Sequence, residues 1–268
     1  MSDWRAALEC ADEQLDLARL AMLIAAGEYT DLDVEAQLDE FDELAGRVPV
    51  GDISVASLRR LMFDDLRFKG NGDDYYDPRN SYLNNVLERR QGIPITLSVV
   101  FLEIGWRLGL DLAPVSFPGH FIVRVGGCDS DLFVDAFHNG IELSRETLLQ
   151  RFRQTFGEQV ARATDQQALF GACPWREVVA RMLRNLKQIY LHKRDWERSL
   201  RITDQLLLVD PSIPGEWRDR GHLYAQIGHM EAAIKDYTHY LQLAPDAADA
   251  QQVRQLLVHS ASNSTRLN

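Results

Sequence analysis

The sequence predicts an α+β protein in which a helix-rich domain with a small antiparallel sheet precedes an all-helical repeat array. Three observations support this prediction. Apolar residues recur at helical spacing through much of the first 108 residues. Two short runs of β-branched and aromatic residues, 120–125 and 132–137, flank a Gly-rich turn. From residue 180 the chain repeats itself with a period of 34 residues, which is typical of stacked helical hairpins.

Five helices are expected before the first strand. They cover residues 15–26, 33–45, 55–63, 80–90 and 94–108. The first is the most apolar segment, but it contains Asp16 and Arg19 and is too short to span a bilayer. The second starts with acidic residues at Asp33 and is followed by Gly46, as helix termini often are. The fifth begins at Pro94, a favoured first-turn residue because an N–H there would have no helical partner.

The two predicted strands form an antiparallel hairpin around the turn 126–130. A helix from Arg145 to Phe156, with Ser144 as its N-cap, closes this domain. The polar stretch 157–167, with the nearby Gly171 and Pro174, is expected to be a linker. We therefore place the first domain at residues 1–165 and the repeat array at residues 176–268.

The repeat aligns residues 180–213 with residues 214–247. The second copy resembles the tetratricopeptide-repeat pattern, in which small residues allow two helices to approach and large residues fill the space between them. It carries Trp217, Gly221, Tyr224, Ala233, Tyr237 and Pro245. The first copy departs from the pattern, since Lys187 stands where the close-packing glycine is expected and Thr203 replaces an aromatic residue. A further helix, 247–258, is expected to cap the array.

Charge and cysteine content exclude several classes of function. The net charge is −11, and residues 1–48 hold 13 acidic and 3 basic side chains. Such a surface repels phosphate backbones, so nucleic acid is not an expected partner. The three cysteines lie far apart without metal-ligand spacing, which favours a reducing cytoplasm and neither a disulfide framework nor a metal site. No cofactor motif and no membrane-spanning segment is recognised.

His120 and Asp135 are the strongest candidates for catalytic residues. The first opens one predicted strand and the second lies late in the next, so antiparallel pairing is expected to bring them together. A carboxylate beside an imidazole fixes its tautomer, as in a nucleophilic triad. We expect the pair to face the first turn of the helix at Pro94, where the helix dipole stabilises an anion. The alternative is a structural hydrogen-bonded pair.

Three stretches resemble a known family. They are residues 74–84, residues 90–98 and residues 117–121. Together with the C-terminal repeats, they resemble the SirB-type proteins, which join a transglutaminase-like core, shared with papain-type cysteine enzymes, to tetratricopeptide repeats. The resemblance covers nearly the whole chain.

The resemblance implies a Cys–His–Asp triad, of which His120 and Asp135 match the last two members. Its cysteine is expected near residues 94–96, and none of these is Cys. Cys10, Cys128 and Cys173 lie elsewhere. The leading hypothesis is therefore a pseudoenzyme that works through protein–protein contacts with a protein or peptide partner. The alternatives are a hydrolase or acyltransferase that uses a hydroxyl nucleophile, and a module that binds a peptide or amide in the old cleft.

The remaining candidate residues allow a functional and a structural interpretation. Thr96 and Ser98 are the candidate hydroxyl nucleophiles, but on a first helical turn such residues are more often capping groups. Three further residues share one helical face, where they either line a pocket facing His120 or tie down the preceding loop. They are Asn80, Asn84 and Glu88. In the repeats, Trp217 and Tyr224 are candidate partner-binding residues.

Overall fold

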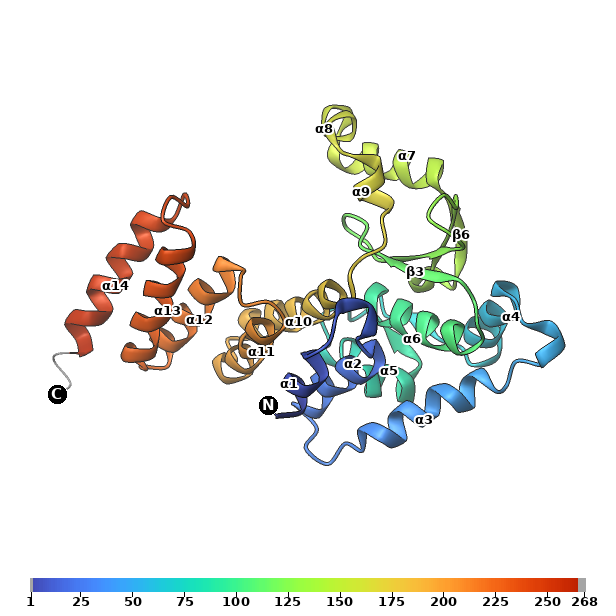
Figure 1. Cartoon of the computed structure of the whole chain (residues 1–268), viewed down its shortest axis with the longest axis horizontal. Coiled ribbons are helices and arrows are strands. Elements are labelled where there is room, and N and C mark those ends of the chain that lie inside the picture. The colour runs from blue at the N-terminus through green and yellow to red at the C-terminus, as the bar shows by residue number, and fades with distance from the viewer. Residues whose placement is uncertain (1, 265–268) are drawn as a thin grey trace. The chain divides into compact units, whose positions relative to one another are not determined.

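The structure, a computed structural model, describes residues 2–264. It divides into two compact units. We call Cys10–Met182 the sheet unit, and Met1–Glu9 together with Leu183–Asn268 the repeat unit. The predicted α+β fold is confirmed, since helices dominate both units and a four-stranded antiparallel sheet lies in the first (Figure 1).

All five predicted N-terminal helices are present, although two of them differ in form. They correspond to α2 (Leu17–Ala26), α3 (Val34–Ala45), α4 (Val55–Arg59), α5 (Leu83–Arg89) and α6 (Pro94–Arg107). The third continues beyond α4 as a π-helical turn, Arg60–Asp65. The fourth starts later than predicted, because Pro78–Asn80 forms a separate 3-10 turn before α5. Short 3-10 turns at Asp12–Gln14 and Val50–Asp52 complete the helical part.

The sheet has two more strands than the sequence predicts. Its order is β3-β4-β5-β6, and all neighbours are antiparallel. The strands are β3 (Leu112–Val115), β4 (Ile122–Val125), β5 (Leu132–Asp135) and β6 (Ile141–Ser144). The predicted hairpin is β4–β5, with Val123 opposite Val134, but both strands are shorter than expected. A separate parallel pair joins β1 (Lys69–Gly70) to β2 (Gln91–Gly92).

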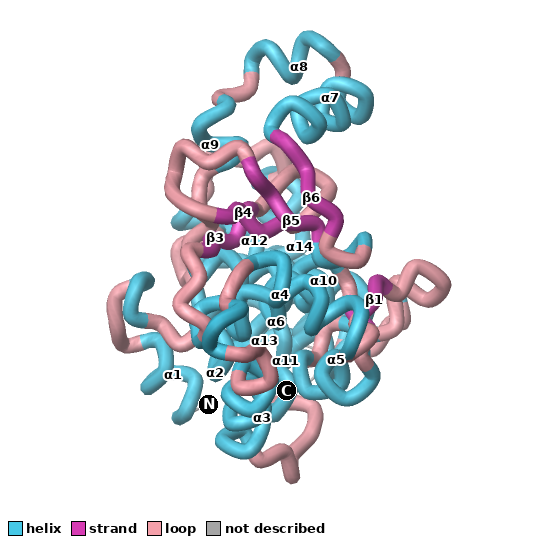
Figure 2. Tube along the Cα trace, turned by 90° about the vertical axis from the view of Figure 1, so that its right-hand side faces the viewer, coloured by secondary structure: helices cyan, strands magenta, loops and turns pink. Residues whose placement is uncertain are grey.

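The sheet lies between helices on both faces (Figure 2). Helix α6 packs against β3 and β4 on one face. The other face carries α7 (Arg145–Phe156), α8 (Glu158–Ala163) and α9 (Gln166–Phe170). A buried cluster joins these helices to the sheet; its members are Val115, Phe117, Ile122, Phe133, Leu143, Leu148, Phe152, Leu169 and Phe170. The stretch 157–167 predicted as a linker is therefore partly helical, and Leu169 and Phe170, which follow it, belong to the core.

The repeat unit consists of antiparallel helical hairpins, as the period predicts. Its helices are α1 (Ser2–Leu8), α10 (Trp175–His192, shared with the sheet unit), α11 (Trp196–Val209), α12 (Pro214–Gln226), α13 (Met230–Leu243) and α14 (Ala250–Ser264). Gly221 allows α12 to approach α13 closely, since a Cβ there would lie 2.6 Å from the ring of Tyr237. The structure also explains why Lys187 stands in the first repeat where a glycine is expected. Its buried ammonium lies 2.6 Å from Glu216 and 2.8 Å from Asp219.

Candidate functional site

A tight turn between β3 and β4 positions His120. The N–H of His120 donates to the carbonyl oxygen of Phe117 at 2.9 Å, and Gly119 has a φ of +75°. Pro118 followed by Gly119 is typical of a type II turn, because proline fixes the first φ and glycine tolerates a positive second φ. His120 therefore lies two residues before β4. The expectation that it opens the strand was wrong by those two residues.

Asp135 is the centre of the site. It is fully buried at the end of β5, and its Oδ1 accepts hydrogen bonds from the backbone N–H groups of Phe137 and His138 at 3.1 and 3.2 Å. Its Oδ2 lies 2.8 Å from His120 Nε2, so the expected proximity of this imidazole and this carboxylate is confirmed. The same Oδ2 lies 2.8 Å from His138 Nδ1. One carboxylate oxygen thus contacts two imidazoles.

The two imidazoles differ in how they meet the carboxylate. His138 Nδ1 forms a hydrogen bond of normal geometry with Oδ2, and its side chain is 56% exposed. His120 Nε2 is buried from solvent and, despite the short distance, makes no hydrogen bond of acceptable angle within residues 2–264. Burial alone would raise the pKa of Asp135, but the two histidines outweigh it and the pKa is lowered. Asp135 is therefore ionised at neutral pH.

Sequence reasoning missed His138, which lies on the 3-10 turn Ala136–His138. The prediction extended the strand to Phe137, and on a strand a side chain three residues from Asp135 points to the opposite face. In the structure Asp135 caps the turn instead, and the turn brings His138 back to its carboxylate. A helix-capping residue type followed by a His at i+3 was the signal that could have found it.

Arg181 holds the backbone of His120 in place. Its guanidinium donates to the His120 carbonyl oxygen at 2.8 Å and to Ser116 Oγ at 2.7 Å. It also lies over the ring of Phe121, 5.3 Å from the ring centroid. Burial lowers the pKa of this arginine, yet both hydrogen bonds are those of the charged form. Arg181 therefore fixes the turn that carries the imidazole.

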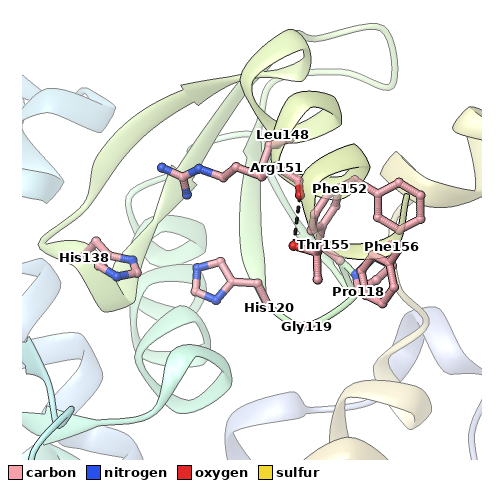
Figure 3. A pocket seen from close by; sticks show the side chains of 10 residues that line it. Pro118, Gly119, His120, His138, Leu148, Arg151, Phe152, Thr155 and Phe156 are labelled. Carbon is pink, nitrogen blue, oxygen red and sulfur yellow. Dashed lines mark hydrogen bonds between the residues drawn. The ribbon is translucent and has the colours of Figure 1, made fainter. Parts of the chain in front are cut away.

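A cavity of about 230 Å³ opens beside the two histidines. Its lining comes from the β3–β4 turn, from His138 and from α7, and consists of Phe117, Pro118, Gly119, His120, His138, Leu148, Arg151, Phe152, Thr155 and Phe156. Figure 3 shows Arg151 reaching from α7 toward the imidazoles of His120 and His138. Asn80, Asn84 and Glu88 are not among the lining residues.

The structure places Asn80 in a supporting position. Its buried amide donates to the carbonyl oxygens of Asp74 and Tyr75 at 2.7 and 3.3 Å, which ties down the preceding loop. Tyr75 in turn packs edge-on against Phe137, beside His138. Asn84 lies on the first turn of α5 with a buried Oδ1 that has no partner among the described residues, and Glu88 is exposed on the same helix.

The two candidate hydroxyl nucleophiles are fully buried on α6. Thr96 Oγ1 donates to the carbonyl oxygen of Asn80 at 2.8 Å and accepts from the N–H of Ile93 at 3.1 Å. Ser98 Oγ is 3.5 Å from the carbonyl oxygen of Phe121. Helix α6 packs against β4 and the Ala136–His138 turn. Within the described part of the chain, however, no hydrogen bond or ion pair joins the His120 side chain to α6.

Trp217 and Tyr224 belong to the repeat unit and are half-buried. Both pack against the cluster formed by Ala233, Tyr237, Tyr240 and Val253. Arg220 lies over both rings, at 4.8 and 5.8 Å from their centroids. Much of each ring is thus used in packing between α12 and α13.

Fold and site together define a transglutaminase-like protein with helical repeats. The family described as the transglutaminase-like superfamily matches residues 31–184, which is more than half of the chain, and the tetratricopeptide repeat matches residues 186–258. A UPF0162 protein of Xylella fastidiosa is 39% identical over 262 residues, which cover 95% of this chain and 93% of that protein. Protein SirB1 of Salmonella typhimurium is 27% identical over 249 residues, covering 87% and 88%.

The chain therefore belongs to the transglutaminase-like superfamily, and the resemblance to SirB-type proteins is confirmed. A third relative matches about half of the chain. F-box only protein 21 of Homo sapiens is 36% identical over 147 residues, which cover 52% of this chain and 22% of that protein. Within residues 2–264, none of the helices combines the length and apolar character needed to cross a bilayer.

Proposed function

We propose that this protein has no thiol-dependent catalysis and works by binding a protein or peptide partner, through its tetratricopeptide repeats and the cleft beside His120. The observation that carries the proposal is the start of α6, where the resemblance places the nucleophile. Pro94, Ile95 and Thr96 occupy it, all three are buried, and none has a thiol.

The three cysteines support this proposal. Burial raises the pKa of the Cys173 thiol to about 12, so it is protonated at neutral pH and a poor nucleophile. Its Sγ donates to the carbonyl oxygen of Pro174. Cys128 is exposed in the turn between β4 and β5, at the end of the hairpin away from Asp135, and Cys10 lies outside the sheet. Within the described residues, His120 has no ion pair or hydrogen bond with any cysteine.

The hydroxyl alternative gains no support from the geometry. A hydroxyl acts as a nucleophile when an adjacent base accepts its proton. The Thr96 proton is engaged by a backbone carbonyl oxygen, and the Ser98 hydroxyl is nearest to another. Both groups are buried, so a substrate would have to displace the packing around α6 to reach them.

The repeat unit offers a surface for a partner. A cavity of about 470 Å³ lies among α10, α11 and α12, and is lined by Leu191, Arg194, Trp196, Asp219, His222, Leu223 and Gln226. Apolar, basic and acidic groups converge there, which suits a peptide segment that inserts one apolar side chain and pairs its backbone or charges at the rim.

A pair of matched variants tests the binding role. Gln226→Lys places a long charged side chain at the cavity, whereas Gln188→Lys makes the same change at an exposed position of α10 outside its lining. Full-length proteins are used to capture partners from a lysate, and the captured proteins are quantified by mass spectrometry. We expect Gln226→Lys to lose partners that wild type and Gln188→Lys retain. Equal capture by all three proteins would contradict a role for this cavity.

The absence of catalysis is tested separately with a fluorophosphonate probe and with peptide amide and ester substrates. We expect neither labelling nor turnover above that of a His120→Ala variant. His120-dependent labelling of Thr96 or Ser98 would show that the protein is an enzyme with a hydroxyl nucleophile.

A further inference from the structure

Three metal-ligating side chains converge on one point of the sheet unit. One ligand atom from each of His120, Asp135 and His138 lies within 4.8 Å of the other two. They come from three different local structures: a type II turn, the end of a strand and a 3-10 turn. No metal site was predicted from the sequence, because its cysteines have no metal-ligand spacing and His138 was not considered.

The spacing suits a single ion. Ligand atoms about 2.1 Å from a metal and at right angles to one another are about 3 Å apart, and opposite ligands are about 4.2 Å apart. Asp135 Oδ2 lies 2.8 Å from both His120 Nε2 and His138 Nδ1. Small side-chain adjustments therefore bring all three atoms to metal distance, and the exposed His138 is free to make them.

A second observation points to a ligand at this place. His120 Nε2 is buried from solvent and has no hydrogen-bond partner of normal geometry within the described residues, although Asp135 Oδ2 lies 2.8 Å away. Buried polar atoms normally find a partner. A metal ion bound between this nitrogen and Asp135 Oδ2 would give the nitrogen a partner.

The surroundings hold the ligand set in place. Two backbone N–H groups anchor Asp135 Oδ1, which leaves Oδ2 as the ligand atom. Arg181 fixes the backbone of His120 through its carbonyl oxygen. Such outer contacts orient ligands and raise affinity in known metal sites.

We infer that His120, Asp135 and His138 bind one divalent first-row transition-metal ion. Two imidazole nitrogens with one carboxylate oxygen suit Zn²⁺, Fe²⁺ or Co²⁺ better than Mg²⁺ or Ca²⁺, which prefer oxygen ligands. Three protein ligands would leave coordination positions open, and His120 and His138 line the cavity of about 230 Å³ from which a further ligand could enter. This inference does not depend on the proposed partner-binding function.

Metal binding is measured on full-length, tag-free protein treated with EDTA and then dialysed. Co²⁺ binding is followed by visible absorption and Zn²⁺ binding by calorimetry. His138→Gln removes one ligand whose side chain is exposed, so the variant is expected to fold; circular dichroism verifies this. His192→Gln, at an exposed position of α10, and Cys128→Ser control for binding to other histidines and to the exposed thiol.

We expect wild type to bind one ion per chain, and both controls to bind it with the same affinity. His138→Gln is expected to weaken binding at least about tenfold and to abolish the shift in melting temperature that the ion produces in wild type. Binding below one equivalent in wild type, or an unchanged affinity in His138→Gln, would overturn the inference and leave a His–Asp–His hydrogen-bonded cluster.

Discussion

Replacing Lys187 with methionine is expected to destabilise the repeat unit strongly. The Lys187 ammonium lies 2.6 Å from Glu216 Oε2 and 2.8 Å from Asp219 Oδ2, and the side chains of Lys187 and Glu216 are only 7% and 6% exposed. Methionine keeps most of the volume of the stem but removes the charge. Glu216 would then be a buried carboxylate that has lost its closest cation.

The expected loss of stability depends on the ion pairs that remain after the substitution of Lys187. Removing one partner of a buried ion pair typically costs about 3–5 kcal/mol, because the other charge stays desolvated. Here Arg184 Nε still lies 3.2 Å from Glu216, and Arg218 still pairs with Asp219. We therefore expect the lower end of that range, about 3 kcal/mol. Replacing Lys187 and Glu216 together by methionine removes both charges and is expected to cost less than about 1 kcal/mol.

Urea denaturation followed by hydrogen–deuterium exchange of peptides from α10 to α13 reports the free energy of unfolding of this unit. Arg198→Met is the control, because Arg198 pairs with Asp195 at the surface and such pairs contribute less than about 1 kcal/mol. A loss of stability in Lys187→Met no larger than that in Arg198→Met would contradict a stabilising buried ion pair. A double variant less stable than Lys187→Met alone would contradict it as well, since the stabilisation would then not depend on pairing.

Two further predictions concern the sheet unit. A Cβ at Gly70 would lie 2.6 Å from the backbone oxygen of Phe137, whereas one at Gly72 would meet nothing within 4 Å. Gly70→Ala is therefore expected to destabilise the protein by about 1–3 kcal/mol in urea denaturation, and a loss no larger than that of Gly72→Ala would contradict this packing. Burial raises the pKa of Asp77, but hydrogen bonds from Arg79 outweigh it, so the folded pKa is lowered and Asp77 contributes stability above its unfolded pKa. The stability lost in Asp77→Asn should accordingly be largest at pH 7 and shrink as the pH falls below about 4; a pH-independent loss would contradict a stabilising charge on Asp77.

The sequence predicts the repeat unit well because its packing is local and periodic. Gly221 meets Tyr237 one helix later in the same hairpin, so a fixed spacing in the sequence becomes a fixed contact. Lys187 departs from the repeat pattern, and its role could not be interpreted from that pattern alone. Its carboxylate partners lie 29 and 32 residues away, and only the folded chain shows that they neutralise a buried cation.

The candidate site was predictable only in part. His120 and Asp135 could be paired because one short turn sets the register of β4 and β5. His138 was missed, because the change from strand to 3-10 turn at Asp135 depends on capping bonds that strand propensity does not reveal. The α7 side of the cavity was missed as well, since Arg151 and Phe152 join its lining only through tertiary packing.

We expect that no cysteine of this transglutaminase-like protein is an activated nucleophile. The most direct test is the rate at which iodoacetamide alkylates each cysteine of the full-length protein at neutral pH, measured by quantitative mass spectrometry against free cysteine. We expect Cys173 to react far more slowly than free cysteine, because it is buried and its pKa is raised to about 12. Cys128 is expected to react at the rate of an ordinary exposed thiol, and Cys10 no faster. A cysteine that reacts at least about tenfold faster than free cysteine, and that loses this advantage in His120→Ala, would be an activated thiol and would contradict the claim.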